Sequence, residues 1–584
     1  MSAEFGSAAP PAPLVTGRAR TIAVLVVLLA FFMDLLDTTI VNVAIPSIQK
    51  DLGASYSAIQ WIIAGYSLAF ALFLITGGRL GDILGYKKLF LFGMGGFTIA
   101  SALCGFAPST EFLIGARVLQ GFMAAMMVPQ ILSTIQVIFT TPEERQGISA
   151  YYGALAGVAT VAGPIIGALL IAGNLWGFEW RTIFLVNLPV GVVSFALAVI
   201  YMPDAKSPHP LRLDLVGVGL ALLAMLLLMY PLIQGRELDW PAWTLIAIAT
   251  SLPVFVLFGF SQVWKDKRDG SPLVVPHLFT RRSFVAGVLL NGCFFGVIAG
   301  FFLTLTLFLQ VGLGYSILKA GLSGIPFSIG VSVAAGLSGP VLVPRYGRAI
   351  VTAGPVVMAI GFAGFIWTIH HFGGVVSPWE MAPSLLVSGV GMGFVVAPVF
   401  PFILAEVPVR DAGSASGVVS AVSQIGGAMG VAVIGVIFFG LIGSRADISA
   451  ESVKADLTAD IVAAGVPSFA APSVFDSLKT CFHDRANAKD FSAEPESCKQ
   501  TEAQQASFAA SQPDVAAKAG AAILKHAIEA NQRNFTSAMA RTLVWQIVAL
   551  ALIFFLTFLL PPRPRTEAEL ARLAAESGTP SPLA

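Results

Sequence analysis

Fourteen long apolar runs dominate this 584-residue chain. Each run has about the 20 residues that an α-helix needs to cross a hydrocarbon core about 30 Å thick. Over the whole chain 56% of the residues are hydrophobic and 11% are charged, whereas about a quarter of the residues of a soluble domain are charged. The chain is therefore predicted to be an all-α integral membrane protein. Its spans are expected to begin near residues 21, 57, 87, 111, 147, 182, 214, 242, 284, 320, 349, 381, 414 and 540.

Basic residues are unevenly distributed over the short connections between these runs. Lys and Arg concentrate in the cytoplasmic loops of membrane proteins. With a cytoplasmic amino terminus, eighteen basic residues fall on the inner side and four on the outer side, the four being Lys50, Arg181, Arg236 and Lys319. We therefore expect a multi-pass protein of the cytoplasmic (inner) membrane with both termini in the cytoplasm. No small-residue cleavage site follows the first run, which favours a span over a signal peptide.

Short internal matches indicate a duplicated chain. The connection "TPEERQG" (141–147) is similar to "VPVRDAG" (407–413), and Pro142 and Gly147 match Pro408 and Gly413. The spans near 214–233 and 242–262 then form an insertion between two six-helix bundles, which an even insertion leaves in the same orientation. The expected parts are a disordered cytoplasmic tail 1–20, a first bundle 21–202, two inserted helices with a linker 203–283, five helices of a second bundle 284–443, a long extracytoplasmic segment 444–539, the last span 540–561 and a cytoplasmic tail 562–584.

The first span carries two acids in the stretch "FFMDLLDTTIVNVAIP" (31–46). A carboxylate at the centre of a span costs about 3 kcal/mol or more. At 100° per residue, a single arc of about 140° holds four polar side chains, which are Asp34, Asp37, Thr38 and Asn42. This arc is expected to face protein or a water-filled cavity. Helix rise places Arg117 of the fourth span at about the depth of these acids, within reach of either one.

Four motifs together resemble the major facilitator superfamily, and within it the fourteen-span drug:proton antiporter branch. They are "GGRLGDILGYKK" after the second span, "RVLQG" in the fourth, "GVATVAGPIIGA" in the fifth and "LDTTIVNVAIP" in the first. The fifth-span motif departs from the family pattern because Ala168 stands where a second glycine is usual. The motif positions are Gly78, Asp82, Gly85, Lys87, Lys88, Arg117, Gln120, Gly163, Pro164 and Gly167.

The resemblance implies a role for each group of residues. Asp34, Asp37 and Arg117, with Thr38, Asn42 and Gln120, are expected to couple protons and bind substrate; a static ion pair that fixes helix packing is the alternative. Gly78, Asp82, Gly85, Lys87 and Lys88 are expected to form a latch that stabilises one closed state, and a solvated loop charge is the alternative. Gly163, Pro164 and Gly167 are expected to form a kinked seam that limits proton leak; simple close packing is the alternative.

Two of the four cysteines lie in the long segment between the last two spans. Cys481 and Cys498 flank "FHDRANAKDFSAEPES" on the expected outer side, where disulfides persist. We expect a Cys481–Cys498 bridge, with two free thiols as the alternative. Cys104 and Cys293 lie within spans, where cysteine commonly behaves as a small apolar residue.

The sequence has no pattern that indicates an enzyme. It has no Gly-x4-Gly-Lys-Ser/Thr phosphate loop and no Cys/His cluster with the spacing of metal ligands. We therefore expect no catalytic residue, no metal and no cofactor, and an ion gradient as the source of energy. The net charge of +1 does not indicate a nucleic-acid partner.

The function that these observations favour is proton-coupled secondary active export of hydrophobic or cationic drugs and toxic compounds. Substrate and protons are expected to compete for the site at Asp34 and Asp37. A lipid or glycolipid flippase on the same fold is one alternative. A receptor or scaffold that works through residues 444–539 without transport is another, although such a protein has no use for two buried acids. A periplasmic adaptor that binds this segment is a possible partner.

Overall fold

A computed structural model describes residues 15–139, 155, 159, 162–207, 212–235, 238–373, 376–407, 412–488 and 494–563. Within these ranges the regular structure is helical, and thirteen helices are long and apolar enough to cross a membrane. The prediction of an all-α membrane protein is confirmed. The expected fifth span is described only at residues 155 and 159 and in the apolar helix Ala162–Gly173, so the count of fourteen is not established. Of the matched residues of the duplication, Pro142, Gly147 and Pro408 lie outside the described ranges.

The first bundle is built from helices that approach one another at glycines. Gly77 on α2 lies against the backbone of Ala125 on α4, and Gly121 on α4 lies against the backbone of Tyr66 on α2, so that a Cβ at either glycine would collide. Small residues of this kind let helix backbones pack closely in a membrane. The helices are α1 (Gly17–Leu52), α2 (Tyr56–Leu84), α3 (Tyr86–Gly105), α4 (Thr110–Ile138), the helix Ala162–Gly173, α6 (Thr182–Leu185) and α7 (Asn187–Tyr201).

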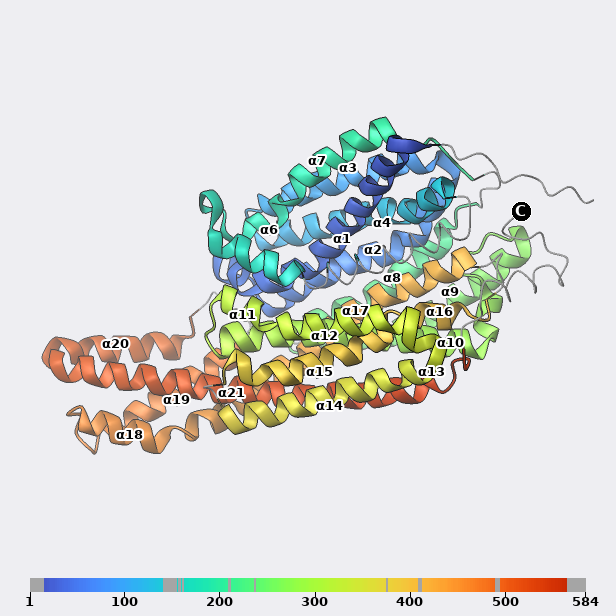
Figure 1. Ribbon diagram of the computed structural model, residues 1–584. Helices are drawn as coiled ribbons and strands as arrows, with labels where there is room; N and C mark the ends of the chain where they lie inside the picture. The colour runs from blue at the N-terminus through green and yellow to red at the C-terminus, as the bar shows by residue number, and fades with distance from the viewer. Residues whose placement is uncertain are drawn as a thin grey trace, which may run out of the picture.

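The second bundle lies beside the first (Figure 1). Its α10 and α17 meet at paired glycines, because Gly296 and Gly430 each lie against the other's backbone. The two bundles touch where Gln310 donates to the carbonyl of Val43 at 3.1 Å. The helices are α10 (Arg282–Leu307), α11 (Ile317–Ser323), α12 (Ile325–Leu337), α13 (Val343–Tyr346), α14 (Ala349–Phe372), α15 (Pro378–Val396), α16 (Val399–Leu404), α17 (Ala412–Glu451) and α21 (Pro513–Thr557).

The two inserted helices are α8 (Leu215–Gln234) and α9 (Ala242–Asp269). Helix α8 covers the seam between α2 and α17, where Leu68, Met229 and Ala432 belong to one buried apolar cluster. Helix α9 packs on α8 and leaves most of its apolar surface exposed, as expected of a helix that faces lipid. In this position α8 covers the interface between α2 and α17.

The segment between the last two spans is also helical. The last turns of α17 and the first turns of α21 extend beyond the apolar parts of these helices. Between them in the chain lie three shorter helices, α18 (Lys454–Ala463), α19 (Ala471–Asn487) and α20 (Glu496–Ser511). These helices project beyond the ends of the bundles (Figure 1) around a small core that includes Leu457 and Phe475. Hydrogen bonds from His526 and Lys525 hold the pKa of Asp460 below its usual value. The structure also has a disulfide between Cys481 and Cys498, which joins α19 to α20.

Loss of this disulfide is expected to loosen α19 and α20. A bridge between residues 17 positions apart is worth about 3 kcal/mol in the chain-entropy account. We expect Cys481→Ser, or reduction of the wild type, to speed proteolysis between α19 and α20 by about 100-fold. Limited proteolysis of the purified protein measures this rate. Cys293→Ser, which removes a free cysteine of α10, is the control and should leave it unchanged; an unchanged rate in Cys481→Ser would contradict the prediction.

Candidate functional site

A buried network of polar side chains lies inside the first bundle, centred on Asp37 of α1. Arg117 of α4 forms an ion pair with Asp37, and both side chains are almost fully buried. Gln120 of α4 and Asn187 of α7 donate to the other carboxylate oxygen at 2.9 and 3.0 Å. Three side chains from two helices therefore bind one carboxylate, which is the arrangement that a buried charge requires.

A second layer of contacts fixes the donors of this network. Gln120 and Asn187 both donate to the hydroxyl of Ser101 on α3, at 3.3 and 3.0 Å. Arg117 donates through Nη1 to the side-chain oxygen of Gln120 at 2.7 Å and through Nε to the carbonyl of Ile62 at 3.1 Å. Because each donor has a second partner, the orientation of the side chains around Asp37 is fixed by the helices themselves.

Asp34 lies one helical turn from Asp37 and has a different environment. Its carboxylate accepts a hydrogen bond from the hydroxyl of Tyr66 at 2.5 Å, and it forms no ion pair with any residue that the structure describes. The Tyr66 ring in turn lies under Arg117, with 4.3 Å between the guanidinium carbon and the ring centre. Tyr66 therefore links the two acids: it binds Asp34 through its hydroxyl and the partner of Asp37 through its ring.

The charges of this network do not balance when all of its groups are ionised. Asp34 and Asp37 supply two negative charges, and Arg117 supplies one positive charge. All three side chains are at most 3% exposed, so water does little to screen the excess. One additional positive charge, either a proton or a bound cation, would make the site neutral.

The structure does not bring Thr38 and Asn42 into this network. Thr38 donates to the carbonyl of Leu35 at 2.8 Å, and Asn42 to the carbonyls of Thr38 and Thr39 at 3.5 and 3.4 Å. Both side chains are half-buried. The single polar stripe expected on the first span is therefore divided into a buried acid pair and two side chains that bond to their own helix.

The motif after α2 is organised by a residue that was not among the predicted site residues. Arg79 is buried and donates to three backbone carbonyls of the segments that flank the inserted helices. They are the carbonyl of Arg212, before α8, at 3.0 Å, and those of Ser271, at 2.9 Å, and Pro272, both after α9. Asp82 is half-buried and accepts from the hydroxyl of Tyr86 at 3.0 Å. Arg79 thus joins the end of α2 to the inserted segment.

The other residues of this motif lie around the turn between α2 and α3. Gly85 has φ +102°, a backbone conformation that favours glycine. Lys87 is half-buried and Lys88 exposed, and within the described chain neither forms an ion pair with Asp82. Gly78 has room for a Cβ, whereas its neighbour Gly81 lies against the side chain of Gln130 on α4.

Gly163, Pro164 and Gly167 form a close seam. A Cβ at Gly163 would lie 2.8 Å from the Cβ of Thr39 on α1, and one at Gly167 would lie 2.7 Å from Ile40. The next residues of the same helix contact α11, because a Cβ at Gly321 of α11 would lie 2.7 Å from Ala168 and 3.2 Å from the carbonyl of Pro164. The helix Ala162–Gly173 therefore touches both bundles, next to the turn of α1 that follows the acids.

Substitution of Gly163 is expected to weaken this seam. Overpacking a tight contact costs about 1–3 kcal/mol, so Gly163→Ala should lower the thermal unfolding midpoint in detergent by several degrees and slow transport about tenfold. Gly173 lies on the same helix and a Cβ there meets nothing within 4 Å, which makes Gly173→Ala the matched control. Equal behaviour of the two variants would contradict the assignment of a close seam.

Three residues of the network were not predicted from the sequence: Tyr66, Ser101 and Asn187. Asn187 had a signal, since it is a lone amide in the apolar run "TIFLVNLPV". Ser101 and Tyr66 had none, because serine and tyrosine are common in spans. For metals, the described residues contain no group of three or more His, Cys, Asp or Glu side chains arranged to hold an ion.

Comparison with known proteins gives a consistent set of relatives. A model of the Major Facilitator Superfamily matches residues 27–431. A protein named "Probable actinorhodin transporter" from Streptomyces coelicolor is 40% identical over 563 residues, which cover 96% of this chain and 95% of the relative. The "Multidrug efflux pump LfrA" of Mycolicibacterium smegmatis is 30% identical, with 79% of this chain and 91% of the relative covered.

Among solved structures, a bacterial homologue of the human lysosomal transporter Spinster, in an inward-facing and unoccupied conformation, is similar to this chain with a TM-score of 0.57. The alignment covers 95% of this chain and 100% of that chain at 15% sequence identity. At this identity the similarity shows the fold alone. It agrees with the two-bundle arrangement of the helices.

Proposed function

The chain belongs to the Major Facilitator Superfamily, a family of membrane transporters, and we propose that it exports hydrophobic or cationic compounds from the cytoplasm in exchange for protons. The names of its relatives support export of antibiotics and other drugs. The proposed transport cycle needs no catalytic step and no cofactor, because the proton gradient supplies the energy.

The observation that carries this proposal is the single excess negative charge of the buried network. A proton on Asp34 neutralises it, and so does a bound monovalent cation. Both cannot be present without a net positive charge in a low-dielectric site, which is strongly unfavourable. Proton and substrate therefore exclude each other, and mutual exclusion at one site is what an antiporter needs.

The two acids have separate roles in the proposed cycle. Asp37 forms the ion pair with Arg117 and accepts hydrogen bonds from Gln120 and Asn187, so it serves as the fixed counterion of Arg117. Asp34 has the hydroxyl of Tyr66 as its partner and exchanges the proton. Loss of that proton changes the bond to Tyr66, whose ring contacts Arg117, and this contact transmits the change to the rest of the network.

Exchange also requires the site to open. Asp34 and Asp37 are 3% and 0% exposed, so neither substrate nor water reaches them in this conformation. We propose that the seam at Gly163 and Pro164 separates during opening, and that the motif around Asp82 and Arg79 latches α2 to the linker in one of the two states. Thr38 and Asn42, half-buried on the same helix, would line the entrance.

The distribution of basic residues supports an orientation of the protein in the membrane. We propose that both termini lie in the cytoplasm and that α18, α19 and α20 lie outside the membrane, where the Cys481–Cys498 bridge persists. The division into bundles 21–202 and 284–443, an insertion 203–283, an outer segment 444–539, a last span 540–561 and two tails remains part of this proposal. No described feature identifies an adaptor, and the proposal does not depend on one.

Transport by the purified protein in proteoliposomes tests the function. With a lumen two pH units more acidic than the bath and the membrane potential clamped, ethidium and actinorhodin are offered separately outside. We expect uptake that depends on the pH gradient and stops when a protonophore collapses it. Uptake of neither compound, together with transfer of labelled phospholipid between leaflets, would contradict drug export and favour a flippase.

A further inference from the structure

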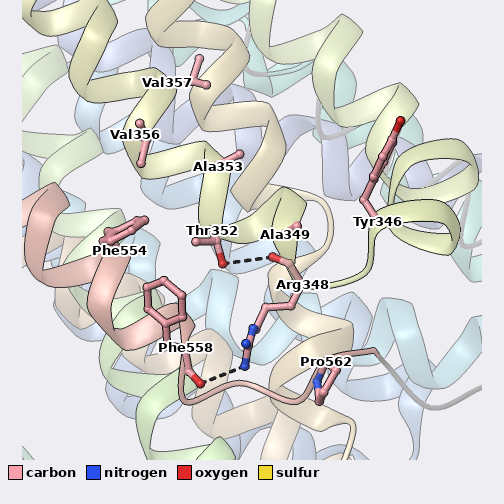
Figure 2. A pocket seen from close by; sticks show the side chains of 10 residues that line it. All are labelled: Tyr346, Arg348, Ala349, Thr352, Ala353, Val356, Val357, Phe554, Phe558 and Pro562. Carbon is pink, nitrogen blue, oxygen red and sulfur yellow. Dashed lines mark hydrogen bonds between the residues drawn. The ribbon is translucent and has the colours of Figure 1, made fainter.

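Helices α14 and α21 lie on the side of the second bundle away from the first (Figure 1), and a groove lies between them. It has a volume of about 530 Å³. Figure 2 shows its two walls: Thr352 and Val356 line it from α14, and Phe554 of α21 and Phe558, just after the end of α21, line the other wall. The groove contains none of the residues of the acid network and none of the motif residues, so the proposed transport cycle leaves it without a role.

One end of this groove is basic. Arg348 immediately precedes α14 and donates through Nη1 to the carbonyls of Phe558 and Leu560 at 2.9 and 2.7 Å, which fixes the guanidinium in the groove (Figure 2). Its Nε and Nη2 have no acceptor among the residues that the structure describes. A guanidinium with donors left over is well suited to a phosphate.

Two further arginines lie at the same end. The side chain of Arg563 lies next to Gly347, because a Cβ at Gly347 would lie 3.2 Å from the Cγ of Arg563. The guanidinium carbon of Arg345 lies 5.5 Å from the ring centre of Tyr346, which lines the groove. Both arginines are exposed, and α14 adds the positive end of its dipole.

The other end of the groove is apolar. From Thr352 towards the middle of α14, the lining residues are Ala353, Val356 and Val357, opposite Phe554 of α21. Val356 is 41% exposed on a helix predicted to span the membrane, so it faces lipid chains. A ligand with an anionic head and an apolar tail would match both ends, whereas a free anion would use only the basic one.

We propose that this groove binds one anionic phospholipid of the cytoplasmic leaflet, with its phosphate at Arg348 and one acyl chain between Val356 and Phe554. Basic pockets between transmembrane helices at the cytoplasmic side commonly bind such head groups. The proposal rests on the orientation given above but not on drug export, because it predicts lipid binding even in a variant that transports nothing. The lipid would hold α14 and α21 together at the end of the last span.

Thermal unfolding of the purified full-length protein in detergent tests the site. Dioleoylphosphatidylglycerol, dioleoylphosphatidylcholine and inorganic phosphate are each titrated in. We expect the phosphatidylglycerol to raise the unfolding midpoint at a concentration at least tenfold below that needed for the phosphatidylcholine, and inorganic phosphate to leave it unchanged. Equal effects of the two lipids would overturn the proposal, as would stabilisation by phosphate alone, which would indicate a free-anion site.

Substitutions locate the binding within the molecule. Arg348 also donates to carbonyls at the end of α21, so its substitution could disturb the fold. The charge is therefore tested at the two exposed arginines. The double variant Arg345→Gln/Arg563→Gln should raise the half-maximal phosphatidylglycerol concentration about fivefold for each arginine removed. Lys267→Gln with Arg268→Gln, at the exposed end of α9, is the matched control and should change nothing. An identical response of the two double variants would overturn the proposal.

A second pair of variants tests the apolar end. Val356→Trp fills the groove and should abolish stabilisation by phosphatidylglycerol. Ile360→Trp, one turn further along α14 and 60% exposed outside the groove, should retain it. Retention by Val356→Trp would place the lipid elsewhere.

Discussion

The variant Asp34→Asn is expected to lose active accumulation of ethidium altogether. With one proton exchanged for one monovalent cation, a gradient of two pH units sustains a concentration ratio of about 100, because each pH unit corresponds to about 1.4 kcal/mol. The asparagine makes the buried network neutral at every pH, so the outward flow of protons no longer drives the cation. The accumulation ratio of Asp34→Asn should therefore be about 1 with the membrane potential clamped.

Controls for Asp34→Asn are available on the same helix and at the same site. Asp51 also lies on α1, but its side chain is 37% exposed and pairs with Arg181, so Asp51→Asn should accumulate ethidium like the wild type. Asp34→Glu keeps a titratable group and should retain part of the accumulation. Full accumulation by Asp34→Asn would show that Asp34 does not carry the coupling proton and that the acid is structural.

The second large effect is expected from breaking the buried ion pair. Arg117→Met leaves the Asp37 carboxylate buried without its cation, and removal of one partner from a buried pair costs about 3–5 kcal/mol. The double variant Asp37→Asn/Arg117→Met removes both charges and should be at least 1.5 kcal/mol more stable than Arg117→Met alone. A double-mutant cycle of the free energy of unfolding in detergent compares the wild type, both single variants and the double variant, and gives the coupling energy between Asp37 and Arg117.

The chain contains a matched exposed pair for this cycle. Arg181 binds Asp51 at 2.6 Å, with side chains 25% and 37% exposed. Exposed pairs contribute about 0–1 kcal/mol, so Arg181→Met and Asp51→Asn should show a coupling below 1 kcal/mol. If the buried and exposed cycles gave the same coupling, the burial of Asp37 and Arg117 would have no energetic consequence and the proposed role of Asp37 as a fixed counterion would be wrong.

The architecture of the protein could be predicted from its sequence because apolar length is a direct requirement of the membrane. Thirteen of the expected spans appear as helices in the described residues. Helix rise predicts that Arg117 can reach Asp37, and the structure brings these two residues together. Helix rise is nearly constant, so the depth of a residue within a span can be counted from the sequence.

The composition of the site could not be predicted in the same way. Rotation about the helix axis decides which polar residues share a pocket, and on α1 the predicted arc was too broad to separate Asp37 from Thr38 and Asn42. Tyr66, Ser101 and Asn187 come from three other elements, and their convergence depends on how those helices pack. In the sequence Arg79 is only one of the eighteen basic residues expected on the inner side, whereas in the structure it donates to carbonyls before α8 and after α9, far along the chain.

Proton release on substrate binding tests the central claim most directly. Ethidium is added to the purified protein in a weakly buffered solution, and a pH indicator reports the protons released for each ethidium bound. We expect about one proton per ethidium from the wild type near neutral pH and none from Asp34→Asn, because the cation replaces the proton of Asp34. Binding to the wild type without proton release, or equal release from both proteins, would contradict the exchange of proton and substrate at this network.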